Sequence, residues 1–134
     1  MKVLILHNRY RAYGGEDAVF DAETALLQRA ADVATHVVEN TAGLSSLTAA
    51  WHLPWSRRSY EAVALRIRRE RPDLVHVHNW FPLLTPSIYD AARNTGVPVV
   101  QTLHNYRIWC AAGSFFRDGR ICEECLVHGP RRAV

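Results

Sequence analysis

Short runs of consecutive hydrophobic residues alternate along the chain with stretches in which hydrophobic residues recur every three or four positions. The runs read as strands buried on both faces of a parallel sheet, and the stretches between them read as amphipathic helices. This alternation predicts an α/β fold, a doubly wound parallel sheet with right-handed crossovers. The predicted strands cover residues 3–6, 33–38, 74–78 and 97–103.

The first predicted helix follows a pair of glycines. Gly14 and Gly15 form a flexible turn, and the two acidic residues after them suit the first turn of a helix that extends to about residue 30. Hydrophobic residues recur in it at helical spacing, and we expect them to pack on the sheet. They are Val19, Ala22, Leu26 and Ala30.

Two further helices have recognisable start and stop signals. Ser56 is a suitable N-cap for a helix that ends before Pro72. Thr85-Pro86 suits the start of another helix, which Gly96 ends. The hydrophobic face of the longer helix consists of Tyr60, Val63, Ala64 and Ile67.

The last part of the chain differs in character from the rest. Residues 1–108 have the alternation of a Rossmann-like core, whereas residues 109–134 form a lobe that contains all three cysteines. Residues 39–55 lack a regular pattern, and a short helix over residues 44–51 is the element expected there. Because no closing element follows the cysteine-bearing lobe, we expect a truncated piece of a longer protein.

Composition and charge narrow the class of protein. The 134 residues suit one domain, and the hydrophobic runs are far shorter than the roughly 20 residues that cross a bilayer, so we expect a cytoplasmic protein. The net charge of +3 reflects arginines clustered between residues 57 and 71, without the interleaved aromatic residues of a nucleic-acid footprint. No nucleic-acid partner is therefore expected. Trp51 and Trp55 make peripheral association with the inner face of the membrane an alternative to their burial.

The same dipeptide follows three of the predicted strands. Ligands of open α/β sheets bind outside the carboxyl ends of the strands, so these residues are expected to share one crevice. Imidazole and carboxamide groups donate to and accept from hydroxyls, which suits a sugar. The alternative is that they cap strands and satisfy loop carbonyls. The dipeptides are His7-Asn8, His78-Asn79 and His104-Asn105.

Gly14 and Gly15 open a helix directly after a strand. Backbone N–H groups and the helix dipole can approach a phosphate at such a position. The pair lacks both the dinucleotide-binding glycine pattern and a P-loop lysine, so neither NAD nor ATP is indicated. A plain tight turn is the alternative.

Two groups of residues suggest metal sites. His76 and His78 alternate onto one side of a strand, and with His104 they would suit a metal-dependent hydrolase, although no acidic residue follows either strand end. In the alternative, His76 is a buried, hydrogen-bonded histidine. A structural zinc ion is the second possibility, with free or partly buried thiols as its alternative; its ligands would be Cys110, Cys122, Cys125 and His128.

Taken together, these motifs resemble the N-terminal, acceptor-side domain of glycosyltransferase family 4, in the GT-B class. The resemblance rests on the three His-Asn pairs and on the Gly14-Gly15 loop, and it extends over nearly the whole chain. The region from Cys110 to Cys125 resembles a cysteine-bearing insertion in one branch of the family. Residues 1–134 are thus expected to be this N-terminal domain, with the insertion over residues 109–134.

The resemblance implies a retaining glycosyltransferase that acts in cell-surface polysaccharide biosynthesis and needs no cofactor for catalysis. A second domain would bind most of the nucleotide-sugar donor, and this domain would hold a saccharide or lipid-linked acceptor. His104 would be catalytic, Gly14 and Gly15 would lie near a phosphate, and His7, Asn8, His78, Asn79 and Asn105 would bind substrate. A catalytically inactive binding fragment, or one subunit of a split enzyme, is the alternative.

Overall fold

The computed structural model describes residues 1–39 and 54–129. The chain divides into two compact units, Met1–Thr102 and Leu103–Val134. The first unit contains the parallel sheet and the second contains the cysteines, so the boundary lies slightly before the predicted one at residue 108. The helix expected over residues 44–51 lies outside the described residues.

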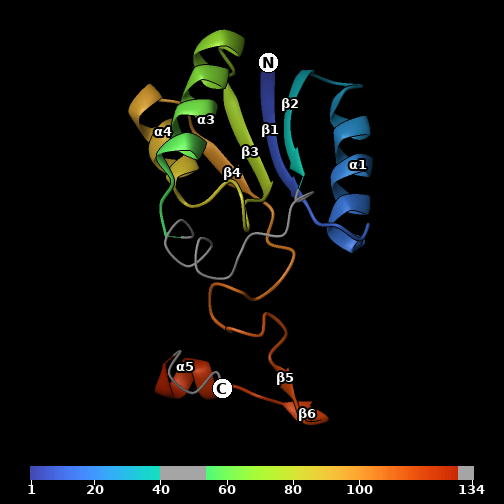
Figure 1. The fold of residues 1–134 in the computed structure, drawn as a ribbon. Coiled ribbons are helices and arrows are strands. Elements are labelled where there is room, and N and C mark those ends of the chain that lie inside the picture. The colour runs from blue at the N-terminus through green and yellow to red at the C-terminus, as the bar shows by residue number, and fades with distance from the viewer. Residues whose placement is uncertain (40–53, 130–134) are drawn as a thin grey trace. The chain divides into compact units, whose positions relative to one another are not determined.

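The first unit is a parallel sheet with helices on both faces, as the alternating pattern predicts. From one edge to the other, its strands are β2 (Asp32–Glu39), β1 (Lys2–Arg9), β3 (Leu74–Asn79) and β4 (Val99–Gln101). The helices described in this unit are α1 (Gly15–Leu27), α3 (Arg57–Glu70) and α4 (Ser87–Thr95). Helix α1 covers one face of the sheet, and α3 and α4 cover the other (Figure 1).

Two hydrophobic clusters fill the space between the sheet and its helices, because successive side chains of a strand point to opposite faces. On the face of α1, the cluster is small and consists of Val3, Ile5 and Phe20. On the other face, the cluster is larger and joins both central strands to α3 and α4. Its buried members are Leu4, Leu6, Val63, Ala64, Ile67, Val75, Val77, Leu84, Ile88, Ala91 and Ala92.

The start and stop signals of α3 act as predicted. The Ser59 backbone N–H donates to the Ser56 hydroxyl over 3.3 Å, and the predicted hydrophobic face is the one that packs on the sheet. Helix α4 ends at Gly96, whose φ of 74° is readily adopted by glycine. Its start differs slightly from the prediction, since Pro86 rather than Thr85 is the N-cap.

Helix α1 is rotated relative to the prediction. Val19 and Leu26 are 44% and 62% exposed, whereas Asp17 and Phe20 are buried. The physical reason is a competing face on the same helix. Phe20 and Leu27 have the same spacing as Val19 and Leu26, and Asp17 on their side forms a buried hydrogen bond with His7 near the end of β1. The expectation that Val19, Ala22, Leu26 and Ala30 form the packing face was wrong.

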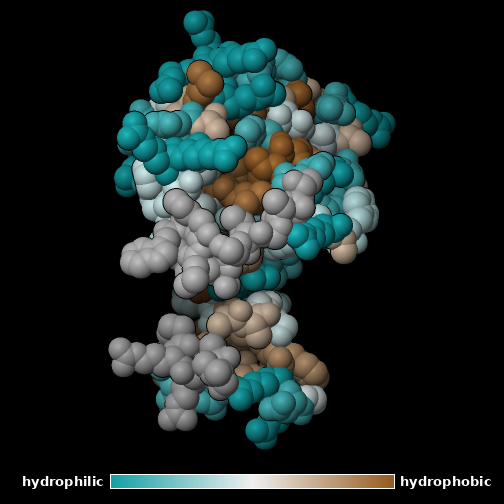
Figure 2. Space-filling model, in the orientation of Figure 1, coloured by the Kyte–Doolittle hydropathy of each residue, from teal (hydrophilic) through white to brown (hydrophobic). Residues whose placement is uncertain are grey.

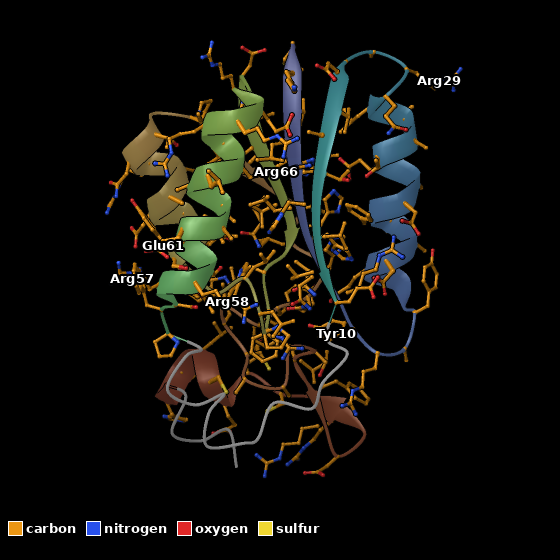
Figure 3. The ribbon with its side chains drawn as sticks, turned by 45° about the horizontal axis from the view of Figure 1, so that its top comes forward. Tyr10, Arg29, Arg57, Arg58, Glu61 and Arg66 are labelled. Atoms are coloured by element: carbon orange, nitrogen blue, oxygen red, sulfur yellow. The ribbon has the colours of Figure 1, made fainter. Side chains whose placement is uncertain are left out.

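The basic residues of α3 do not all project freely into solvent. Arg57 pairs with Glu61 one turn later, with 2.7 Å between Arg57 Nε and Glu61 Oε1. Arg66 lies over the sheet, where its guanidinium donates to the Thr35 carbonyl of β2 over 3.1 Å (Figure 3). Part of the predicted basic stripe therefore stabilises this unit internally.

The surface of the first unit is largely hydrophilic in the view of Figure 2, where a hydrophobic area is visible over β1 and β2 beside α3. The partly buried residues of β2 that pack against the larger cluster are Ala34 and Val38. In the described parts of the chain, no helix combines the length and hydrophobicity needed to cross a bilayer.

The second unit has little regular structure. Strands β5 (Phe116–Arg117) and β6 (Arg120–Ile121) form a short antiparallel hairpin, and α5 (Glu124–His128) follows it. Asp118 and Gly119 connect the two strands with φ values of 52° and 77°, as a tight hairpin turn requires. Several of its hydrophobic side chains are exposed, including Trp109, Ile121 and Val127.

Candidate functional site

The end of β1 is joined to the start of α1 by one buried carboxylate. Asp17 Oδ1 lies 2.9 Å from His7 Nε2, and both side chains are buried. Asp17 Oδ2 accepts a hydrogen bond from the Gly14 backbone N–H, also over 2.9 Å. Phe20 stacks on the His7 ring with 4.4 Å between the centroids. Asp17 therefore fixes the glycine loop and the imidazole in one arrangement.

Burial controls the protonation of this pair. Burial lowers the pKa of His7 from its ordinary value, and the opposing hydrogen bond with Asp17 does not restore it. For Asp17, burial acts to raise the pKa, but hydrogen bonds from His7 and the Gly14 N–H outweigh it, so the pKa is lowered. At neutral pH the pair is thus a neutral imidazole that donates from Nε2 to an ionised carboxylate.

The glycine pair lies at the exposed start of α1. Gly14 is the N-cap, with an extended φ of −131°, and Gly15 is the first helical residue. A Cβ at either position would meet nothing within 4 Å. Neither backbone strain nor packing inside the described chain therefore requires glycine here, and the space over the helix start is open to a ligand.

The asparagines near the ends of β1 and β3 contact the backbone; both lie within their strands, and not after them as predicted. The Asn79 amide donates to the Asn8 carbonyl over 3.0 Å, and its oxygen accepts the Phe81 N–H. The Asn8 amide oxygen accepts the Leu83 N–H over 3.1 Å. These bonds hold the loop after β3 against the end of β1, as expected of strand caps. Binding of substrate by Asn8 and Asn79 stays a prediction.

His76 and His78 meet an acidic residue that the sequence interpretation missed. Glu23 of α1 lies 3.9 Å from His76 Nε2 and 3.5 Å from His78 Nε2. His76 is buried, and its Nε2 also forms a 2.9 Å hydrogen bond with the Thr102 hydroxyl. The acidic partner comes from the helix rather than from a strand end. Once Asp17 and Phe20 face the sheet, helical spacing places Glu23 on the same side.

Comparison with known families decides the classification. Residues 17–120, more than half of the chain, match the model of the family described as Glycosyltransferase Family 4. The chain belongs to glycosyltransferase family 4. A comparison with curated proteins finds no match. Among solved structures, the chain is similar to the C-terminal domain of a hydrogenase from Pyrococcus furiosus, with a TM-score of 0.49 and 18% identity, covering 75% of this chain and 90% of that chain. So weak a likeness carries no argument.

The predicted site of this family 4 domain is divided between the two units. His7, Asn8, Gly14, Gly15, His78 and Asn79 belong to the first unit, and His104 and Asn105 belong to the second. Strand β4 is shorter than the predicted strand over residues 97–103 and ends at Gln101. His104 therefore does not directly follow a strand, because Thr102 and Leu103 lie between it and the end of β4. Among the described strands, β4 lies at the edge of the sheet and pairs with β3. The Asn105 amide oxygen accepts the Arg107 N–H over 3.0 Å.

The four proposed zinc ligands all belong to the described part of the second unit, and no three of them form a group of ligand atoms within 4.8 Å of one another. Cys110 is buried, whereas Cys122 and Cys125 are half-buried and His128 lies 3.8 Å from Glu124. Backbone N–H groups, that of Phe115 foremost, lower the pKa of the Cys110 thiol. In residues 1–39 and 54–129, the potential metal-ligand group with atoms within 4.8 Å of one another is Glu23, His76 and His78. The fold thus does not gather the four predicted ligands, and zinc binding by them stays a prediction.

Proposed function

We propose that this domain holds the acceptor in an enzyme that transfers a sugar from a nucleotide-sugar donor to a saccharide or lipid-linked acceptor, with retention of configuration. Membership of family 4 supports sugar transfer as the reaction class. A second domain would bind most of the nucleotide. The enzyme would act in the cytoplasm, or at the inner face of the membrane, in the biosynthesis of a cell-surface polysaccharide.

The start of α1 carries this proposal. Gly14 and Gly15 are exposed, and no neighbouring atom explains the absence of their side chains. Backbone N–H groups in the first turn of a helix have no partner within the helix, and the helix dipole attracts anions there. The Gly14 N–H is bonded to Asp17, so Gly15 is the glycine whose N–H would meet a phosphate. The ligand would be the donor diphosphate or an acceptor phosphate.

His104 is proposed to act at the reacting sugar. In the transfer step, the bond between the anomeric carbon and the diphosphate oxygen breaks, a bond to the acceptor oxygen forms, and the acceptor proton leaves with the diphosphate. A side chain that contacts the sugar mainly in the transition state affects turnover more than affinity. In an enzyme completed with its donor domain, His104→Ala should remove most transfer without lowering the melting temperature. A lower melting temperature with near-normal turnover would make His104 structural.

The glycine proposal is tested by NMR titration of the full chain with inorganic pyrophosphate. We expect saturable shifts of the Gly14, Gly15 and Glu16 amide signals, and their loss in Gly15→Val, whose side chain would occupy the open space. The matched control is Ala22→Val on the exposed side of the same helix. Equal binding by Gly15→Val and the unmodified chain would show that the glycine pair is only a turn.

A further inference from the structure

Three metal-binding side chains meet between α1 and the sheet. His76 and His78 are two positions apart in β3, so their imidazoles lie on the same face. Their ring centroids are 4.4 Å apart. Glu23, from α1, presents one carboxylate oxygen to each ring. Sequence-distant elements thus converge on one small volume, and their potential ligand atoms all lie within 4.8 Å of one another.

The distances fit a shared ion better than direct hydrogen bonds. The separations of 3.5 Å and 3.9 Å between the Glu23 oxygens and the imidazole Nε2 atoms exceed the usual range of hydrogen bonds, about 2.7–3.2 Å. Around a tetrahedral zinc ion with bonds of about 2.0–2.1 Å, neighbouring ligand atoms are roughly 3.3–3.5 Å apart. The 3.5 Å between a Glu23 oxygen and His78 Nε2 matches this spacing, and the limit of 4.8 Å over all three ligand atoms exceeds it by little more than 1 Å.

Burial and charge favour the same conclusion. Both histidines are buried, and Glu23 is half-buried. An ion pair with Glu23 would require a buried imidazolium beside a second imidazole, and burying a charged ring is unfavourable. A divalent ion needs no imidazolium, because neutral imidazole is itself the ligand and the carboxylate offsets part of the ion's charge.

We propose that Glu23, His76 and His78 form a binding site for a divalent metal ion of the zinc class. The Thr102 hydroxyl lies beside this site, 2.9 Å from His76 Nε2. When the ion binds, it would replace that hydroxyl as the partner of His76 Nε2. The ion joins α1 to β3, next to Phe20, whose ring centroid is 5.5 Å from that of His78. Its role is to hold α1, and with it Asp17 and the glycine loop, in place. This role is independent of the sugar-transfer proposal and requires no hydrolysis.

The test uses the full chain with Cys110, Cys122 and Cys125 replaced by serine, so that thiolates do not bind the probe. Cobalt(II) is titrated and followed by its visible absorption, and zinc binding is measured by equilibrium dialysis. We expect one ion per chain, the intense bands of four-coordinate cobalt, and a higher melting temperature with zinc. Glu23→Gln should weaken binding by about tenfold or more, and His78→Gln should abolish it.

The matched control is Glu61→Gln, an exposed glutamate of α3 that should leave metal affinity unchanged. Far-UV circular dichroism shows whether each variant is folded; if His78→Gln is not, the nearly isosteric Glu23→Gln decides. Absence of cobalt or zinc binding by the cysteine-free chain would overturn the proposal. Equal affinity of Glu23→Gln and the cysteine-free parent would do the same, and the cluster would then be a hydrogen-bonded ion pair only.

Discussion

The two faces of the central sheet are built from different kinds of residues. The face under α3 and α4 is hydrophobic, with Leu4 and Leu6 of β1 beside Val75 and Val77 of β3. The face under α1 has Val3 and Ile5 of β1 in its hydrophobic cluster, and polar residues begin beside Ile5, where His76 of β3 is its partner in register. There, the buried residues are His7, Asp17, His76 and His78. One face is thus a continuous hydrophobic core, and the other combines a small hydrophobic cluster with buried polar side chains.

The difference shows how a parallel sheet accommodates a site. Alternation along a strand lets one set of side chains build a continuous core while the other set holds buried polar groups. Pairing stabilises such groups, because an unpaired polar atom destabilises a buried position. Asp17 provides this pairing for His7 and Gly14. The rotation of α1 therefore brings the buried imidazole and the glycine loop their shared partner.

The largest expected effect tests that rotation. Phe20→Ala should lower the free energy of unfolding by about 3–5 kcal/mol, because the ring is buried against Val3, Ile5 and His7. Leu26→Ala, on the exposed side of the same helix, should change it by less than about 0.5 kcal/mol. Urea denaturation of both variants measures the contrast. A larger loss in Leu26→Ala than in Phe20→Ala would mean that α1 packs with the face predicted from Val19 and Leu26.

The hydrophobic face should respond to truncation independently of pH. Leu6→Ala should destabilise the chain by about 2–5 kcal/mol, since Leu6 is fully buried in the larger cluster. The loss should be the same at pH 7 and pH 5, because the removed contacts carry no titratable group. Urea denaturation at both pH values provides the measurement. A loss that shrinks markedly in acid would indicate that the two faces are coupled.

A smaller effect is expected from removing the buried carboxylate. Asp17→Ala should lower the free energy of unfolding by about 1–3 kcal/mol at pH 7, because His7 Nε2 and the Gly14 N–H lose their partner. The control is Asp21→Ala on the same helix, whose more exposed contact with Arg9 should contribute at most about 1 kcal/mol. Thermal and urea unfolding compare the two. Equal losses would show that Asp17 stabilises the chain no more than a partly exposed carboxylate of the same helix.

The smallest expected effect is a pH dependence of the face under α1. The pKa of His7 is lowered from 6.5 by burial, so the unfolded chain binds more protons and stability falls as the pH drops below about 6.5 toward the folded-state pKa. The pKa of Asp17 is also lowered, from 3.8, so its contribution is present above that value and is lost as the pH falls through the folded-state pKa.

Melting temperatures between pH 7 and pH 3 measure this dependence. The difference between the unmodified chain and Asp17→Ala should not shrink between pH 7 and pH 4, because Asp17 opposes the lowering of the His7 pKa by burial. It should shrink below about pH 3.8, where the pH approaches the lowered pKa of Asp17 and its contribution is lost. His36→Gln serves as a control, because burial also lowers the pKa of His36 in β2, outside the pair. A difference that stays constant across the whole range would show that the pair does not titrate with folding.

Much of the fold follows from local patterns. The hydrophobic runs predict four parallel strands, and the Ser56 cap and the Gly96 stop identify the limits of α3 and α4 to within a residue or two. These signals are local, because a strand buried on both faces needs a continuous hydrophobic run and a helix end needs a cap. The family could likewise be predicted from the His-Asn and glycine motifs, and the match over residues 17–120 confirms it.

Only the tertiary structure decided how α1 is rotated and which side chains meet beneath it. Val19 and Leu26 have hydrophobic periodicity, but so do Phe20 and Leu27. The bond between Asp17 and His7 lies on the side of Phe20 and Leu27, and with that side packed on the sheet Glu23 lies beside His76 and His78. The spacing of hydrophobic residues indicates which sides of a helix can be buried. A buried polar contact between residues distant in the sequence is formed in only one rotation of the helix about its axis. Such a contact is not encoded in local spacing, since its partners are brought together only when the helix packs on the sheet.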